Sequence, residues 1–389
     1  MKMAKGAFNM PWEERTVTEQ RVEFVKRAKE CRNFSALCRE YGISRKTGYK
    51  WVERAAKNES LLNRSRRPDS CPLKTPQPIE QMILGKRIEN PGWGAKKIKT
   101  TLENETSIKL PSARTVDRIL LRNGMISPEE SAKHMPFIRF ERKKCNELWQ
   151  TDFKGFFRTL DGLRCYPLDI LDDHSRYAIK ISATPDTKNV VIPAFSAAFR
   201  EYGLPSAILS DNGPQFAGFK KGYTQFEKWL MDLDILPIHG RFFHPQTQGK
   251  IERFHRSMKQ ELLNHYQFQD YKEADAVLNQ WRLKYNNERP HEALGNQCPG
   301  RIYVPSERQY PERISTYTYD GQHVIKVNTW GYARFAGFQI YLSETLIGEW
   351  IEFRANPHAD SFLACYRNYC IAEFSVLDGT VLNRSIRRL

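Results

Sequence analysis

Between residues 147 and 287, short apolar segments with strand character alternate with amphipathic helical segments. The expected order is three strands, a helix, a strand, a helix, a strand and two helices. The expected strands cover residues 147–158, 163–171, 177–184, 206–210 and 235–239, and the expected helices cover 189–202, 223–233, 249–267 and 270–287. Segments that alternate in this way fold into a sheet with helices on its faces. The pattern therefore predicts an α/β core over residues 147–295.

Three acidic residues of this core lie beside apolar strands or at a helix start, which are unusual positions for an acid that only faces solvent. Asp152 ends an apolar and aromatic run, Asp211 lies where strand 206–210 enters an Asn-Gly turn, and Glu252 opens helix 249–267. Carboxylates at two strand ends and on one helix can converge on Mg²⁺, which prefers hard oxygen ligands. A pair of such ions can hold both the attacking and the leaving oxygen of a phosphate displacement.

Helix 249–267 also carries basic residues near Glu252. Arg256 and Lys259 follow Glu252 at helical spacing, so the three residues share one face and two cations could follow a DNA backbone. The alternative is a surface ion pair between Glu252 and Arg256. Other polar residues have expected roles as well: Asn212, His244 and Gln246 are candidates for supporting contacts, and His244 could equally fix a loop backbone. Asp172 and Asp173 are expected to cap a turn rather than to bind metal.

The positive charge of the chain is concentrated in its first third. Residues 1–125 contain 27 Lys and Arg against 14 Asp and Glu, whereas the remainder contains 34 against 31. This asymmetry indicates a front end that binds a polyanion, with a solvated basic surface as the alternative. No apolar run reaches the roughly 18 residues of a membrane span, and the first 25 residues carry charges without an apolar signal segment. We therefore expect a cytoplasmic protein.

Two sets of helices are predicted in this basic region. The first occupies residues 18–56, where Gly42 forms a turn and Ser44 caps a third helix. The second occupies residues 77–125, where Ser112 caps the last helix. The helix-turn-helix spacing would present cations of each third helix to DNA, and two such units on one tether would clamp a longer site. The expected DNA contacts are Arg45, Lys46, Lys50, Arg114 and Arg118. The predicted inward-facing side chains include Val22, Phe24, Val25, Tyr49, Trp51, Ile83 and Ile88.

Proline-rich and strand-like segments complete the organisation. Between the helical sets, the linker contains Arg64, Arg66 and Arg67, which could lie in a minor groove or form a basic tether. Short alternating segments after residue 300 predict a small antiparallel β domain, with a protein-binding role as the alternative to DNA contact. The eight cysteines show neither disulfide nor zinc spacing. The expected domains are a helix-turn-helix domain over 1–60, a linker over 61–76, a second helix-turn-helix domain over 77–127, a linker over 128–146, the core over 147–295 and the β domain over 300–389.

Four segments of the core together resemble the catalytic domain of DDE transposases and retroviral-type integrases, and more narrowly bacterial insertion-sequence transposases. The segments are Trp149-Gln150-Thr151-Asp152-Phe153-Lys154-Gly155, Leu171-Asp172-Asp173-His174-Ser175-Arg176, Ser210-Asp211-Asn212-Gly213 and His244-Pro245-Gln246-Thr247-Gln248-Gly249-Lys250-Ile251-Glu252-Arg253. They follow the order of the family. One departure is that 40 residues separate Asp211 from Glu252, a longer gap than is typical, and we expect the extra residues in the loop around 218–222.

The resemblance implies a multidomain protein with a central RNase H-like core and a specific activity. Asp152, Asp211 and Glu252 would be catalytic and would hold two divalent ions, Mg²⁺ or Mn²⁺. The protein would bind the terminal inverted repeats of a mobile element. Water would cut one strand, and the 3′-hydroxyl so formed would attack target DNA. Double-stranded DNA, both element ends and target, and further copies of the chain in a synaptic complex would be the partners, with no membrane.

Two other functions fit part of the same pattern. A DNA-binding regulator with an inactive integrase-like core would retain the helical front end, but all three acids are present. An RNase H-type nuclease acting on RNA–DNA hybrids would share the core, but it would not need two helix-turn-helix units. Cleavage of duplex DNA that contains the element ends separates these possibilities.

Overall fold

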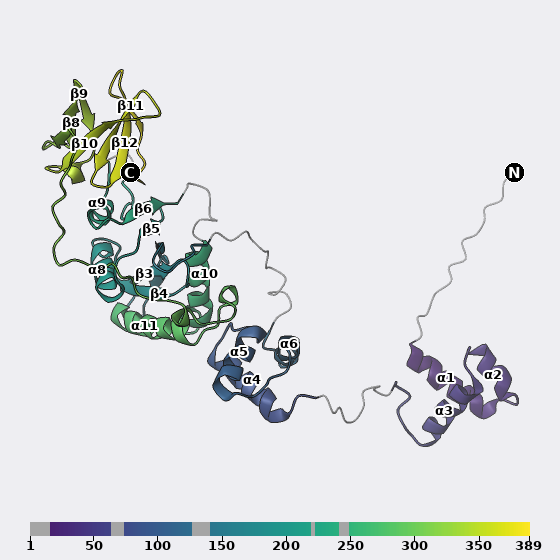
Figure 1. The fold of residues 1–389 in the computed structure, drawn as a ribbon. Helices are drawn as coiled ribbons and strands as arrows, with labels where there is room; N and C mark the ends of the chain where they lie inside the picture. The colour runs from purple at the N-terminus through teal and green to yellow at the C-terminus, as the bar shows by residue number, and fades with distance from the viewer. Residues whose placement is uncertain (1–15, 64–73, 127–140, 219–221, 241–248) are drawn as a thin grey trace, which may run out of the picture. The chain divides into compact units, whose positions relative to one another are not determined.

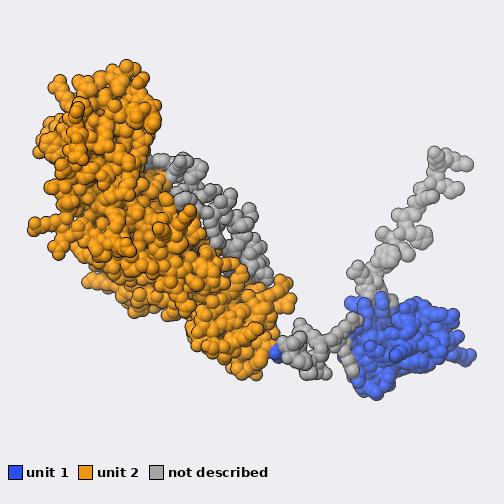
Figure 2. Space-filling model, in the orientation of Figure 1, with its two compact units in different colours: residues 1–74 blue, residues 75–389 orange. Residues whose placement is uncertain are grey.

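A computed structural model describes residues 16–63, 74–126, 141–218, 222–240 and 249–389 of the chain. By internal contacts it divides into two compact units, Met1–Lys74 and Thr75–Leu389, which Figure 2 shows in different colours. Within the described residues, no helix combines the length and the apolar content required to cross a bilayer.

The first unit is a three-helix domain. Its helices are α1 (Val17–Glu30), α2 (Phe34–Glu40) and α3 (Arg45–Ala56). Phe24, Leu37 and Trp51 are buried where the helices meet. The Ser44 hydroxyl accepts a hydrogen bond from the Thr47 amide at 3.2 Å, which confirms the predicted start of α3.

The second unit begins with another three-helix set and continues into the core and a β domain (Figure 1). The helices are α4 (Gln77–Glu89), α5 (Ala95–Thr106) and α6 (Ala113–Arg122). Ile83, Ile98 and Ile119 are among the residues buried between them. The Ser112 hydroxyl accepts from the Thr115 amide at 3.2 Å, so α6 also begins where the sequence predicts.

Three of the predicted inward-facing residues are instead exposed. Val22, Tyr49 and Ile88 expose 54%, 53% and 69% of their surface. On a helix, residues two apart do not share a face, so burial of Phe24 turns Val22 outward and burial of Trp51 turns Tyr49 outward. The ring of Tyr49 still stacks on Phe34, with centroids 4.4 Å apart. Helical periodicity was therefore predicted correctly, but the exact buried face was not.

The core is a mixed sheet between two layers of helices. Its strands are β1 (Trp149–Phe153), β2 (Phe157–Arg158), β3 (Arg164–Asp172), β4 (Ala178–Thr184), β5 (Ala207–Ser210) and β6 (Leu236–His239). The order is β2-β3-β1-β5-β6, with β4 also paired to β3. β1 runs antiparallel to β3 and parallel to β5, and β5 runs parallel to β6. The predicted strand 147–158 is split, because Gly155 adopts a φ of +85° between β1 and β2.

Helices cover both faces of this sheet. They are α8 (Val191–Tyr202), α9 (Gln225–Asp232), α10 (Gly249–Met258) and α11 (Tyr271–Asn287). Phe195 of α8 and Leu230 of α9 pack with Ile170 on one face. Phe254 of α10 and Trp281 of α11 belong to the cluster on the other face, so the predicted packing role of Trp281 is confirmed. α10 continues into a π-helical turn, Lys259–Leu263.

The last part of the chain forms the predicted antiparallel β domain. Its strands are β7 (Val324–Lys326), β8 (Tyr332–Phe335), β9 (Phe338–Tyr341), β10 (Trp350–Ala355), β11 (Ser361–Tyr366), β12 (Tyr369–Ser375), β13 (Val381–Asn383) and β14 (Arg387–Arg388). One sheet has the order β13-β12-β11-β10-β7 with β14 on β12, and β8 pairs with β9. The fold class predicted from the sequence is confirmed: helical front end, α/β core and C-terminal β domain.

Candidate active site

The sheet brings Asp152 and Asp211 to the same edge. Trp149 and Gln150 of β1 pair with Ile208 and Leu209 of β5 in parallel. Asp152 lies on β1 two residues beyond Gln150, and Asp211 follows the end of β5 two residues beyond Leu209. Side chains at matching positions of parallel neighbours point to the same face of a sheet. The β1–β5 pairing therefore brings two carboxylates that are distant in sequence into one neighbourhood, where the charge of Asp211 acts on Asp152.

The electrostatics of Asp152 reflect this neighbourhood. Burial raises the pKa of Asp152 to about 6, the nearby His255 opposes the rise, and the negative charges of Asp211 and Asp169 add to it. Repulsion between carboxylates that cannot separate is relieved when a cation binds between them. The donor chemistry and the crowding of charge at this edge both fit a divalent metal ion.

Asp211 and its neighbour are fixed by backbone contacts. The Gly213 amide donates to Asp211 Oδ1 at 3.0 Å, and the Asn212 side-chain amide donates to the Gly240 carbonyl at 2.8 Å. Asn212 therefore ties the loop after β5 to the end of β6. This contact acts on the loop that carries Asp211, and a supporting role for Asn212 in a reaction stays a prediction.

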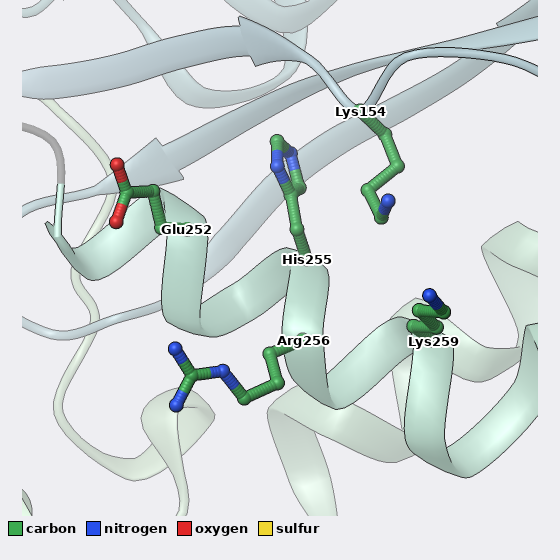
Figure 3. A pocket seen from close by; sticks show the side chains of 5 residues that line it. All are labelled: Lys154, Glu252, His255, Arg256 and Lys259. Atoms are coloured by element: carbon green, nitrogen blue, oxygen red, sulfur yellow. The ribbon is translucent and has the colours of Figure 1, made fainter.

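Glu252 lies on α10 beside the sheet edge. Ile251, Phe254 and Met258 are buried against the core, as predicted, which leaves Glu252, Arg256 and Lys259 exposed on the opposite side of α10. These three residues, together with Lys154 and His255, line an open cavity of about 280 Å³. Figure 3 shows Glu252 and His255 projecting from the same side of α10, and Lys154 reaching toward the helix from the end of β1. Among the described residues, Glu252 forms no ion pair with Arg256, so the alternative of a surface ion pair finds no support there.

The three acids are not all in contact. No hydrogen bond or ion pair within the described part of the chain joins Glu252 to Asp152 or Asp211. Likewise, no three His, Cys, Asp or Glu side chains of that part are grouped closely enough to hold a metal ion. The structure brings the two aspartates together and places Glu252 on the adjoining helix.

Buried ion pairs fasten both ends of this helix. Lys250 Nζ lies 2.6 Å from Asp173 Oδ2 in the turn after β3, two residues before Glu252. At the other end, Arg289 Nε donates to Glu261 Oε1 of the π-helical turn at 2.8 Å, and Arg289 Nη2 donates to Ser257 Oγ of α10 at 2.9 Å. These contacts fix where α10 sits on the sheet and therefore where Glu252 projects.

Asp172 and Asp173 are structural, as the sequence predicts. Asp172 Oδ2 accepts from the Ser175 amide and hydroxyl, at 2.8 and 2.6 Å, and closes the β3–β4 turn. Asp173 Oδ1 accepts from the Gln150 side chain at 2.7 Å. Both carboxylates are fully engaged in holding the turn and the start of α10.

Sequence reasoning missed three residues of this site. Asp169 is fully buried in β3 and is the direct cross-strand partner of Asp152. His255 is 8% exposed and lies between the two, and Lys154 lines the cavity. Asp169 could have been noticed as an acid inside an apolar strand, and His255 as a residue three positions after Glu252.

The predicted DNA contacts of the helical sets are exposed where they are described. Arg45, Lys46 and Lys50 lie on the surface of α3, and Arg114 and Arg118 lie on the surface of α6. Lys50 Nζ also lies 5.2 Å from the centre of the Trp51 ring. Five other candidates, Arg64, Arg66, Arg67, His244 and Gln246, fall outside the described residues.

The chain combines two three-helix sets with a mixed α/β core in which acidic side chains gather beside one helix. Two models described as "Integrase core domain" match residues 142–245 and 233–299. A "Helix-turn-helix domain" model matches residues 20–68, and a "Homeodomain-like domain" model matches residues 47–120. The chain thus carries matches to an integrase core and to helix-turn-helix domains, and the proteins similar to it include insertion-sequence and transposon proteins and a retroviral Gag-Pol polyprotein.

Individual relatives agree with this placement. A 31.7 kDa protein of insertion element IS407 from Burkholderia multivorans is 28% identical over 158 residues, which cover 40% of this chain and 55% of that protein. The transposase of transposon Tn552 from Staphylococcus aureus is 22% identical, with 88% of this chain and 82% of the relative covered. The chain spans about half the length of the IS407 protein and of the IS476 protein of Xanthomonas euvesicatoria, at 55% and 44%.

Among solved structures, the magnesium complex of the HTLV-2 integrase catalytic core domain is similar at 19% identity. The match covers 42% of this chain and 99% of that one, with a TM-score of 0.33.

Proposed function

We propose that this chain is a transposase that binds the terminal inverted repeats of its own mobile element and catalyses DNA cleavage and strand transfer. The observation that carries the proposal is the meeting of Asp152 and Asp211 at one sheet edge, beside the helix that bears Glu252. The integrase core matches and the helix-turn-helix matches support it independently.

The proposed chemistry assigns a task to each acid. Two Mg²⁺ or Mn²⁺ ions would supply positive charge at the phosphate and lower the pKa of the attacking hydroxyl. Asp152 would hold both ions, while Asp211 and Glu252 would each hold one. Lys154, Arg256 and Lys259 would bind phosphate oxygens of the strand along the cavity.

The reaction would consist of two in-line displacements at phosphorus. In the first, water attacks the scissile phosphate and the 3′-oxygen leaves with a proton as a free hydroxyl. In the second, that 3′-hydroxyl attacks a target phosphodiester, and the target's own 3′-oxygen leaves. Neither step requires a covalent bond to the protein. Because two ends must be joined to one target, the protein would act as a homo-oligomer on double-stranded DNA, in a bacterial cytoplasm at the nucleoid.

The test is strand cleavage of duplex DNA carrying the element ends, with wild-type protein and Asp152→Asn. We expect the variant to fold and bind the ends normally but to lose Mg²⁺-dependent cleavage by at least about 1000-fold, since it removes a proposed ligand of both ions. Asp320→Asn, an exposed acid in the C-terminal part of the chain, is the matched control and should cut normally. Full cleavage by Asp152→Asn would refute the site, and a wild type that binds ends without cutting would favour the regulator.

A further inference from the structure

A buried carboxylate behind the proposed site has no role in the reaction as described so far. Asp169 of β3 is fully buried and is the Cα partner of Asp152 in the β1–β3 ladder. Neither of its oxygens forms a well-aligned hydrogen bond with the described residues. Burying an acidic group without aligned partners is costly. The Asp169 carboxylate is retained despite this unfavourable burial and lies directly beside a proposed catalytic acid. Its position therefore points to a role at the proposed site.

His255 connects this carboxylate to Asp152. Its Nε2 lies 2.8 Å from Asp169 Oδ2, and its Nδ1 lies 3.9 Å from Asp152 Oδ2. The ring is almost completely buried and comes from α10, one turn after Glu252. His255 therefore links α10 to one ionisable group on β3 and one on β1.

The three elements that meet at this ring are those that carry the site. β1 provides Asp152, β3 provides Asp169, and α10 provides both His255 and Glu252. A ring held by Asp169 at one nitrogen presents the other nitrogen to Asp152 Oδ2. At 3.9 Å this is an electrostatic contact rather than a hydrogen bond, and it draws the Asp152 carboxylate toward α10. A carboxylate behind a histidine fixes a ligand in the same way in many metal sites.

We propose that Asp169 and His255 are positioning residues that orient Asp152, and with it the spacing between Asp152 and Glu252, for metal binding. This inference rests on the proposed function. Asp169 is fully buried behind the site, whereas His255 also lines the cavity, and the role assigned to the pair is to orient Asp152. The consequence is that the metal affinity of the site depends on these two residues.

The experiment compares wild type, His255→Ala, His255→Asn and Asp169→Asn as full chains. Mn²⁺ binding is followed by the electron paramagnetic resonance signal of the free ion, alongside end cleavage, end-DNA binding and thermal unfolding. We expect His255→Ala and Asp169→Asn to weaken Mn²⁺ binding by about 10- to 100-fold. The Mn²⁺ concentration needed for half-maximal cleavage should rise by the same factor. End binding should not change.

The conservative variant separates positioning from mere packing. Asn at 255 keeps a polar group where Nδ1 faces Asp152, so His255→Asn should recover at least about tenfold of the Mn²⁺ affinity that His255→Ala removes. His358→Ala, in the exposed β10–β11 turn, is the matched histidine control and should behave as wild type. If His255→Ala fails to fold, Asp169→Asn and His255→Asn still decide the question.

The outcomes distinguish this inference from the function on which it rests. Wild-type Mn²⁺ affinity in folded Asp169→Asn and His255 variants, with an active wild type, overturns the positioning role alone. A wild type that neither binds Mn²⁺ nor cuts end DNA overturns the proposed function, and the positioning role with it. Weakened binding with recovery in His255→Asn supports both.

Discussion

At the scale of single residues, the central feature is that Asp152 lies in an environment that disfavours its ionised form. Burial and two neighbouring acids raise its pKa to about 6, from an ordinary value of 3.8. In the metal-free protein its ionised form therefore opposes folding. Sites that bind cations commonly store such unfavourable charge, because the ligand compensates it.

Replacing Asp152 should accordingly stabilise the metal-free protein at neutral pH. A carboxyl whose pKa is higher in the folded state weakens folding as pH rises from about 4 to about 6, and the loss persists above that range. Asp152→Asn cannot ionise, so in EDTA at pH 7 it should be more stable than wild type by up to about 3 kcal/mol. Near pH 3.5 the two proteins should be nearly equal.

Urea unfolding of both proteins at several pH values measures this difference. Asp320→Asn serves again as the exposed-acid control and should show no pH-dependent gain. Equal stability of wild type and Asp152→Asn at both pH values would mean that ionised Asp152 does not destabilise the folded protein.

The sequence was informative about these residues only in part. The proximity of Asp152 and Asp211 could be predicted, because the pattern placed Asp152 within one strand and Asp211 at the end of another strand of the same α/β core. Asp169 could not be linked to Asp152, because their pairing depends on the β1–β3 register, which no local pattern determines. Whether Asp152, Asp211 and Glu252 share ions remains a prediction.

At the scale of elements, the exposed lysines of α3 define a DNA-binding surface that can be tested. Lys46 and Lys50 are exposed on α3, whereas Lys57 at its end is paired with Glu53, with Nζ 2.7 Å from Oε1. If α3 binds DNA phosphates, Lys46→Ala and Lys50→Ala should each weaken end binding. The slope of log K against log salt should become shallower by about 0.9 for each phosphate that the variant no longer neutralises.

Titration of end DNA at several salt concentrations measures the slope. Lys57→Ala is the matched control on the same helix, since its charge is already neutralised by Glu53, and it should leave the slope unchanged. Identical slopes for Lys46→Ala, Lys50→Ala and wild type would remove α3 from the DNA interface.

The elements themselves were largely predictable, and the failures have physical causes. Ser44 and Ser112 marked helix starts correctly because a side-chain cap is a local interaction. Ile88 was assigned to a buried face although five residues from Ile83 span well over one turn, which carries it away from that face. The break between β1 and β2 follows from the positive φ of Gly155, which the residue type permits but does not require.

At the scale of the second unit, the β domain is fastened to the edge of the core at α9 and the turn that follows it. Tyr366 Oη donates to Asp232 Oδ1 at 2.6 Å, and Arg367 Nε lies 2.9 Å from the same oxygen. The Tyr223 amide donates to Ser343 Oγ at 2.9 Å. The Asp232–Tyr366 hydrogen bond joins residues 134 positions apart in sequence, so the β domain was predictable but its attachment was not.

Loss of Asp232 should therefore destabilise the core and the β domain together. Asp232→Ala leaves the Tyr366 hydroxyl and the Arg367 guanidinium without their shared acceptor, at a cost of about 2–4 kcal/mol. Chemical denaturation of the full chain, followed by tryptophan fluorescence, measures the change. Asp360→Ala, in an exposed turn of the β domain, should have no measurable effect, and an equally stable Asp232→Ala would show that these interactions do not hold the two parts together.

The most direct test of the proposed site is anomalous X-ray scattering from Mn²⁺ in crystals of the protein bound to end DNA. We predict two peaks, with carboxylate oxygens of Asp152 within about 2.0–2.3 Å of both, and oxygens of Asp211 and Glu252 each beside one. Peaks elsewhere on the protein, or a Glu252 carboxylate that stays apart from ions held by the two aspartates, would contradict a site built from these three acids.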